Sequence, residues 1–362
     1  MTSVSPSINP LTPGPSQPEG PAFVLTPARG GITGDVVLAH LTRGAAAVVI
    51  MMLVSLVGVL AYASIPSIQA FGASFLVSSE WRANELNQPR KGPDGNVVIE
   101  DGEVVMDTLP PVFGALPVIF GTAVSSALAL AFAVPVSLGA ALFLVRIAPG
   151  WMKGPVSFLI EFLAAIPSIA YGIWGLFVLV PFLQRYVEPP LNHFFAATPG
   201  LRWLSFDATP TGRDLFAGGL ILGIMIVPII TAVGRDILRG VPRAQVEGTV
   251  ALGATWWQSA KEMLKYSRSG LFGAIMLGLA RAAGETMAVT MVIGNKNQIS
   301  ASLFAPAQTM SSLLASEFAE ASDIQRSALM EVALILLLMS LLFNVIARYL
   351  VVGKNARTAA AH

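Results

Sequence analysis

The sequence contains no cysteine and very little charge. Cysteine is absent from all 362 residues, which excludes disulfides, thiolate catalysis and cysteine-based metal sites in this chain. Charged residues make up only 12% of it, against roughly 25% in an average soluble domain. The net charge is +1 and no basic cluster is interleaved with aromatic residues, so nothing favours a nucleic-acid partner. The three histidines, His40, His193 and His362, are far apart and are expected to be loop or terminal residues rather than metal ligands.

Apolar residues dominate what is there. They make up 54% of the chain, and the mean hydropathy is +0.69. A helix needs about 20 mostly apolar residues to cross the hydrocarbon core of a membrane. Six segments meet this length: residues 44–66, 115–145, 155–181, 214–238, 269–294 and 328–352. The predicted fold class is therefore an all-α polytopic membrane protein surrounded by membrane lipid.

Prolines lie inside three of these predicted spans. Pro135, Pro167 and Pro228 are expected to kink the second, third and fourth spans. In membranes such kinks are tolerated where neighbouring helices supply partners, and they often line a pathway. A simple packing kink is the alternative.

Charge distribution predicts the orientation of the chain. Basic residues gather in the 146–153 and 235–268 loops, whereas the 67–113 loop has three basic and seven acidic residues. Short basic loops stay on the cytoplasmic side, so both termini are predicted to be cytoplasmic and 67–113 external. Residues 1–35 are rich in proline without apolar periodicity, which predicts a disordered tail before a transmembrane domain of residues 36–362.

The loops predicted to be external have some structure. In "VVIEDGEVV" (97–105), Asp101-Gly102 is flanked by β-branched residues, which indicates a two-residue hairpin. In "TMSSLLASEFAEAS" (309–322), the apolar residues fall on one helical face. This pattern predicts a short amphipathic helix that lies on the outer surface or dips into the bundle.

The stretch "LARAAGETMAV" (279–289) places two charges inside an apolar run. A charge at the centre of a membrane helix costs roughly 2.5–3.5 kcal/mol on insertion scales and usually faces a bundle interior or a cavity. Arg281 and Glu285 are four residues apart, a spacing that predicts an ion pair on one helix face. The pair is either purely structural or part of an anion path, since a guanidinium fork fits a tetrahedral oxyanion. Thr286 and Thr290 would add hydroxyl groups to such a path.

Small residues surround this pair. Gly278, Ala280, Ala282, Ala283, Gly284 and Ala288 lie on either side of it. Such residues let another backbone approach closely, so the helix is predicted to pack tightly. Glu161 is the second acid within a predicted span. It is either a path residue or an interfacial partner.

The 239–266 segment is more than a polar loop. "VPRAQVEGTVALGATWWQSAKEML" has helical periodicity with a break at Gly253, which predicts two short helices that project from the bundle to dock another protein. An interfacial amphipathic helix with tryptophan anchors is the alternative. The sequence has no G-x-x-x-x-G-K-[ST] nucleotide-binding motif, so any ATP is expected to act on another chain.

These stretches resemble the ABC-importer permeases, and within them the phosphate permeases of the PstC type. "EGTVALG" matches the family's E-A-A-x-x-x-G coupling motif, with Gly248 and Thr249 in place of the two alanines. The family usually closes this segment with Leu-Pro, where this chain has Leu264-Lys265. "GLARAAGETMAVTMVIGN", "LIEFLAAIPSIAYGIWGLFVLVP" and "TMSSLLASEFAEA" also look like the family. The resemblance covers about residues 44–352.

The resemblance implies a type I importer permease with six transmembrane helices in a bacterial cytoplasmic membrane, not an enzyme. It implies four further protein chains: a second permease of the PstA type, a dimeric ATPase of the PstB type and a phosphate-binding protein of the PstS type. ATP and magnesium would be bound by the ATPase, with no cofactor in this chain. The residues implied to enter a cleft of the ATPase are Glu247, Gly248, Ala251, Leu252, Gly253, Ala254 and Trp257.

Three other functions compete with this hypothesis. A permease for sulfate, molybdate or another oxyanion is the nearest, because an intramembrane arginine does not choose among oxyanions. A proton-coupled secondary transporter would use Glu161 or Glu285 as carriers, but inverted repeats would be expected and none is found. A membrane enzyme would need a cluster of catalytic groups at one membrane face, and no such cluster is present in the sequence.

Overall fold

The computed structural model describes residues 34–83, 86–89, 99–100, 103–104, 106–206, 211–321 and 323–359. The tail predicted for residues 1–35 lies outside these ranges, apart from its last two residues. The chain divides into two units, Met1–Ser55 and Leu56–His362. The described residues of the first unit belong to α1 (Gly34–Phe71), which continues into the second.

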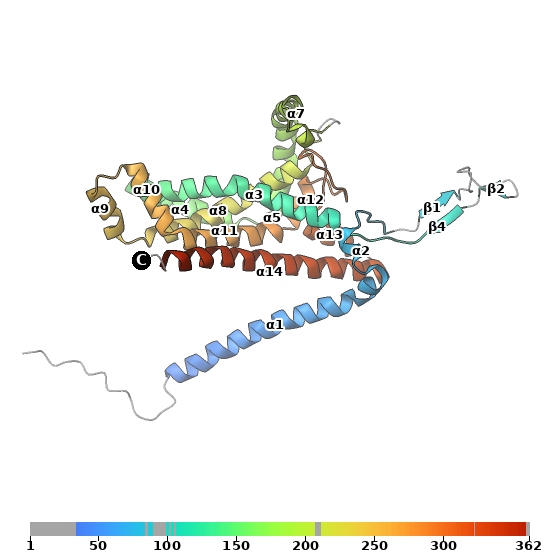
Figure 1. The fold of residues 1–362 in the computed structure, drawn as a ribbon, viewed down its shortest axis with the longest axis horizontal. Coiled ribbons are helices and arrows are strands. Elements are labelled where there is room, and N and C mark those ends of the chain that lie inside the picture. The colour runs from blue at the N-terminus through green and yellow to red at the C-terminus, as the bar shows by residue number, and fades with distance from the viewer. Residues whose placement is uncertain are drawn as a thin grey trace, which may run out of the picture. The chain divides into compact units, whose positions relative to one another are not determined.

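The second unit is a bundle of helices (Figure 1). Its α-helices after α1 are α2 (Ser74–Val77), α3 (Leu116–Leu142), α4 (Gly150–Ala165), α5 (Ser168–Trp174), α6 (Val180–Phe182), α7 (Glu188–Ala197), α8 (Leu215–Arg239), α9 (Arg243–Ala251), α10 (Trp256–Tyr266), α11 (Arg268–Ala283), α12 (Met287–Val292), α13 (Met310–Glu317) and α14 (Asp323–Ala359). Single π-helical turns follow α3, α5 and α6, namely η1 (Phe143–Ile147), η2 (Gly175–Leu179) and η3 (Leu183–Val187), and η4 (Arg202–Leu204) is a 3-10 turn.

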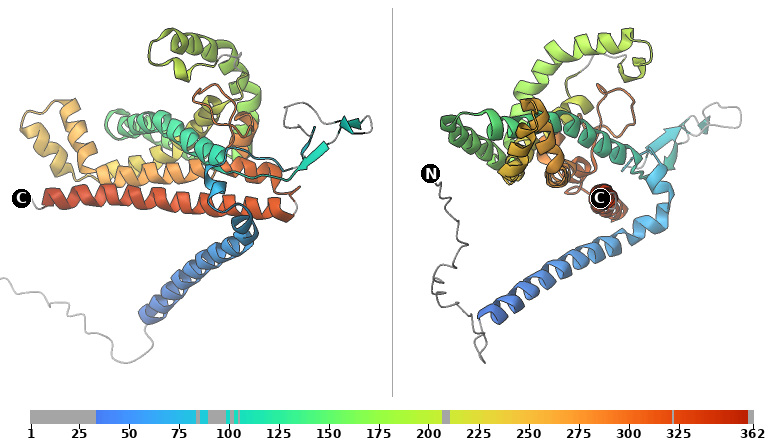
Figure 2. Two further views of the ribbon diagram at one scale, coloured as in Figure 1. Left: turned by 45° about the vertical axis from the view of Figure 1, so that its right-hand side comes forward. Right: turned by 60° about the vertical axis from the view of Figure 1, so that its left-hand side comes forward.

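Four short strands lie between α2 and α3. Antiparallel pairs join β1 (Leu86–Pro89) to β4 (Met106–Leu109) and β2 (Ile99–Glu100) to β3 (Glu103–Val104). The second pair brackets Asp101-Gly102, the predicted turn, which lies outside the described residues. The strands lie at the opposite end of this unit from α9 and α10 (Figures 1 and 2).

Helix α8 is the centre of the bundle, where it packs against α3, α4 and α11. The Asp214 side chain begins it, because Oδ1 accepts a hydrogen bond of 2.9 Å from the Ala217 amide. Midway along α8, the Ser137 hydroxyl of α3 donates to the Val227 carbonyl over 3.1 Å, directly before Pro228. Both helices remain continuous, Pro135 and Pro228 included.

Pro167 has a different effect and corrects the third predicted span. Helix α4 ends at Ala165, and Ile166 is extended with φ −62° and ψ 132°. The ring of a proline disfavours helical conformation at the residue before it. The prediction of one helix over 155–181 was therefore wrong in its bounds. Helix α4 is a separate helix, and the helical run long enough to cross a membrane is Ser168–Ala197.

Five helical runs in the described part of the chain are long and apolar enough to cross a membrane. They are Val36–Phe71, Leu116–Ile147, Ser168–Ala197, Leu215–Arg239 and Asp323–Val345. The predicted span 269–294 is not among them, since it is divided into α11 and α12. The prediction of a helical membrane protein is confirmed, while the number six and the cytoplasmic termini stay predictions.

Glycine allows the closest approach between α3 and the segment before α13. A Cβ atom built on Gly121 would lie only 2.0 Å from the Gln308 carbonyl oxygen, a backbone atom that has little room to move. Gly139 lies in the same helix, and a Cβ atom there would meet nothing within 4 Å.

We expect Gly121→Ala to destabilise the protein by about 1–3 kcal/mol, the usual range for overpacking a tight contact. Gly139→Ala is the matched control, and in the same helix it should be neutral or stabilising by up to about 1 kcal/mol. Thermal unfolding of the purified chain in detergent measures both. Equal shifts for the two variants would show that the 121–308 contact is not tight.

Candidate functional site

The conspicuous feature of the bundle is a break in the segment that carries both charges of "LARAAGETMAV". Helix α11 ends at Ala283, and α12 starts at Met287. Between them, the Glu285 amide donates to the Ala282 carbonyl over 3.3 Å, and the Ser311 hydroxyl of α13 donates to the Glu285 carbonyl over 2.7 Å. The break is thus a defined structure held from a neighbouring element.

Glu285 points into the protein. Its side chain is buried, and Oε1 accepts a hydrogen bond of 3.3 Å from the Ala288 amide at the start of α12. The Glu285 carboxylate therefore stabilises the backbone where α12 begins.

Arg281 is exposed on the surface of this chain. It shares that side of α11 with Gly273, Leu277, Ala280 and Gly284, which are also exposed. The Arg281 guanidinium makes no ion pair or hydrogen bond with the described residues, and its charge acts on Tyr171 of α5. The predicted pair with Glu285 was wrong, because α11 stops at Ala283 and a spacing of four no longer places both residues on one helical face.

The two threonines of the predicted path differ. The Thr290 hydroxyl donates its proton to the Thr286 carbonyl within the same segment, so it has no proton left for an anion. The Thr286 hydroxyl makes no hydrogen bond with the described part of the chain. Of the two, only Thr286 is free to donate.

Small residues pack this segment closely, as predicted from the sequence. Ala282, Ala283 and Ala288 are buried. A Cβ atom on Gly278 would lie 2.7 Å from the Ile230 side chain of α8. One on Gly172 of α5 would lie 3.0 Å from the Ala288 Cα atom of α12. Gly278 thus leaves room for a side chain of α8, and Gly172 brings α5 close to the backbone of α12.

Glu161 lies apart from Arg281, in an ion pair between α4 and α8. Its Oε1 atom is 3.0 Å from Nη2 of Arg235, and Nε of the same arginine is 2.9 Å from Oδ1 of Asp236. Arg235 lies where the predicted 214–238 span and the predicted basic loop 235–268 overlap, and the structure shows it as a buried residue of α8. The signal was its spacing, since Arg235 lies four residues after Thr231 and three before Leu238, which are both buried.

The 239–266 segment forms two helices, α9 and α10 (Figure 1). Gly253 makes the turn with φ +80°, a conformation that favours glycine. Thr255 and Gln258 start α10 with a capping box, and its buried residues Ala260 and Met263 pack against Leu238 of α8. Helix α10 is thus fixed to the bundle.

The turn itself is bare. The Leu252 side chain is 91% exposed and that of Trp257 is 62% exposed, and Glu247, Gly248, Ala251 and Gly253 are exposed as well, while Ala254 is half-buried. Exposed apolar residues gathered at the tip of a projecting helix pair are typical of an interaction site, and docking at this turn stays a prediction.

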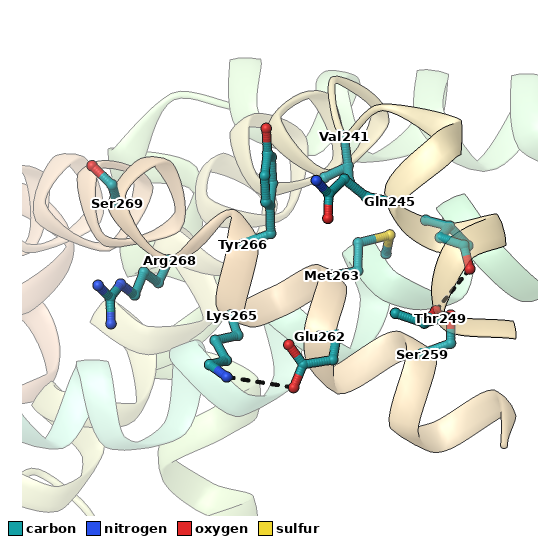
Figure 3. A pocket seen from close by; sticks show the side chains of 11 residues that line it. Val241, Gln245, Thr249, Ser259, Glu262, Met263, Lys265, Tyr266, Arg268 and Ser269 are labelled. Atoms are coloured by element: carbon teal, nitrogen blue, oxygen red, sulfur yellow. Dashed lines mark hydrogen bonds and ion pairs between the residues drawn. The ribbon is translucent and has the colours of Figure 1, made fainter. Parts of the chain in front are cut away.

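A cavity of about 360 Å³ with a mixed polar and apolar lining lies between α9, α10 and the start of α11 (Figure 3). On its wall the Thr249 hydroxyl donates to Ser259 over 3.2 Å, and Lys265 lies 3.5 Å from Glu262. The Thr249–Ser259 contact joins α9 to α10, whereas the Lys265–Glu262 pair lies within α10.

Comparison with known proteins gives consistent relatives. Residues 133–353 match the model of the family described as binding-protein-dependent transport system inner membrane component. The proteins named phosphate transport system permease protein PstC from Haemophilus influenzae and Pasteurella multocida are 40% and 42% identical, over 84% and 86% of this chain and 89% of each relative. The protein of that name from Mesorhizobium japonicum is 41% identical over 89% of this chain and 91% of its own length. A chain of the MetNI methionine ABC transporter, solved in inward facing conformations, has 16% identity and a TM-score of 0.48, and covers 66% of this chain and 95% of its own.

We expect Ser311→Ala to loosen the break between α11 and α12, because a buried carbonyl that loses its donor costs about 1–3 kcal/mol. Hydrogen–deuterium exchange of the amides of residues 284–288 should become faster. Ser316→Ala is the matched control, since the Ser316 hydroxyl donates within α13 to Leu313. Exchange as slow as in the wild type would show that the Ser311 bond does not hold the break.

Proposed function

This chain belongs to the family of binding-protein-dependent transport system inner membrane components, and we propose that it is the permease subunit that conducts inorganic phosphate in an ATP-driven importer. Relatives that carry the phosphate permease name match it over most of both chains. The chain is a multi-pass membrane protein, and the membrane we assign to it is the bacterial cytoplasmic membrane.

The observation that carries the proposal is the exposed, unpaired guanidinium of Arg281. Within the described residues no carboxylate neutralises it, and the nearby Glu285 is turned inward to the α12 backbone. A membrane helix tolerates such a charge where it faces a cavity or a partner. An oxyanion in transit supplies the missing negative charge, and the planar guanidinium fork fits two oxygens of a tetrahedral anion.

The bare face around Arg281 also favours a second permease. Gly273, Ala280 and Gly284 expose small side chains or none, which allows a helix of another chain to come close. The path then runs between two permeases, this one and a partner of the PstA type. Thr286 would add a hydroxyl donor beside the arginine.

Energy for transport comes from a different chain. Moving an anion into a negative-inside cell runs uphill by about 2.3 kcal/mol per charge per 100 mV. The turn with Leu252 and Trp257 is the surface that we assign to a dimeric ATPase of the PstB type, which binds ATP and magnesium. A phosphate-binding protein of the PstS type delivers the anion to the opposite end of the bundle.

We expect Arg281→Ala to abolish phosphate uptake in cells that express the four proteins and lack their own phosphate permease. Arg281→Lys keeps the charge without the fork and should retain partial uptake. Co-purification of the partners controls for assembly, and sulfate and molybdate are added as competitors. Normal uptake by Arg281→Ala would remove the arginine from the path. Wild-type uptake that sulfate or molybdate blocks would move the substrate to another oxyanion.

We expect Leu252→Glu to prevent co-purification of the ATPase, because it places a charge where apolar contact is proposed. The 91% exposure of Leu252 means that this change leaves the fold of the chain intact. Ile299→Glu, at another exposed apolar residue outside α9 and α10, is the control. An ATPase retained as well by Leu252→Glu as by the control would argue against docking at this turn.

A further inference from the structure

The ion pair between α4 and α8 has an unusual position. The Arg235 side chain is only 7% exposed, whereas those of Glu161 and Asp236 are 57% and 62% exposed. One carboxylate comes from α4 and the other from the next residue of α8 itself. A buried cation held in this way contacts one partner across a helix boundary and one on its own helix.

Helix α4 packs against α8 only through partly buried side chains. It contains no buried residue, and Glu161–Arg235 is the ion pair that joins it to another helix in the described part of the chain. Apolar packing fixes the position of a helix weakly where no side chain is fully enclosed. The Glu161–Arg235 pair therefore helps to fix the position of α4 along α8.

Arg235 also lies close in sequence to α9 and α10, the helix pair to which we assign ATPase docking. It is four residues before Arg239, the last residue of α8, and α9 starts at Arg243. A movement of α9 acts on the last turn of α8, and Arg235 lies immediately before that turn.

Near the same C-terminal end that carries Glu161, α4 is connected to the break between α11 and α12. Across the interruption at Pro167, the Tyr171 hydroxyl of α5 donates to the Leu163 carbonyl of α4 over 2.8 Å. Helix α5 then contacts α12 through Gly172, whose Cβ position lies 3.3 Å from the Met287 carbonyl oxygen. A shift of α4 thereby reaches the residues that follow Glu285.

We propose that Glu161 and Arg235 are positioning residues that transmit the movement of α9 and α10 through α4 and α5 to the break beside Arg281. The inference rests on the proposed function, because an ATPase must move the coupling helices. The proposal makes a specific claim about coupling. Transport is coupled to ATP hydrolysis only if Arg235 is paired with a carboxylate on α4, and a carboxylate on its own helix is not enough.

The chain offers a matched pair of variants. Glu161→Gln and Asp236→Asn each remove one carboxylate from the same guanidinium, at 3.0 and 2.9 Å respectively, and only the first lies on another helix. The complete complex is reconstituted in vesicles with its binding protein, and phosphate uptake and ATP hydrolysis are measured together. Glu161→Gln should lower the phosphate transported per ATP by roughly fivefold or more, the lower end of typical coupling between sites. Asp236→Asn should leave this ratio close to that of the wild type.

Two results would overturn the proposed transmission through Glu161 and Arg235. One is an unchanged ratio of phosphate to ATP in Glu161→Gln. The other is an equal loss in both variants, which would mean that Arg235 needs only a negative charge nearby. If Glu161→Gln does not assemble, Glu161→Asp decides, since it keeps the charge and withdraws it by one methylene group. It should lower the same ratio, and an unchanged ratio would again overturn the proposed transmission. A wild-type complex without phosphate uptake would count against the proposed function, whereas wild-type uptake with normal coupling in the variants counts against the proposed transmission alone.

Discussion

The cost of keeping an arginine charged inside a membrane-crossing bundle is the constraint on which this structure depends. A guanidinium does not lose its proton, so each such residue needs negative charge or water near it. Arg235 meets this need within the chain, between Glu161 and Asp236. Arg281 has no such carboxylate among the described residues, so the negative charge near its guanidinium must come from outside this part of the chain. One arginine therefore serves the fold, and the other is the residue that we propose meets an anion beside a partner chain.

Close backbone packing makes that open face stable. Around α11 and α12, glycine and alanine replace large side chains, so that α5 and α8 contact the segment directly. The interruption at 284–286 leaves backbone groups without helical partners, and in a membrane such groups must be satisfied by the protein. Ser311 and the Glu285 carboxylate supply two of those bonds. Glu285, which lies close to Arg281 in the sequence, thus accepts a hydrogen bond from the backbone and does not pair with the arginine.

Features that depend on a single local property of one residue could be predicted from the sequence. The turn at Gly253 and the packing role of Gly278 follow from the small size of glycine. The pairing of Arg281 with Glu285 could not be predicted, because the spacing rule assumes a helix that tertiary contacts interrupt. The burial of Arg235 could not be predicted either, because its partner Glu161 is 74 residues away. Pro167 breaks a helix while Pro135 and Pro228 do not, a difference set by the packing of each helix.

The turn between α9 and α10 has a consequence for how this protein evolves. Its exposed residues contribute almost nothing to the stability of their own chain, since they contact so little of it. Apart from Gly253, whose positive φ favours glycine, substitutions there should change folding little and act mainly on the docking that we propose. The turn and its receiver would then change together from lineage to lineage. A permease transplanted from a distant system would fold normally and still remain unpowered.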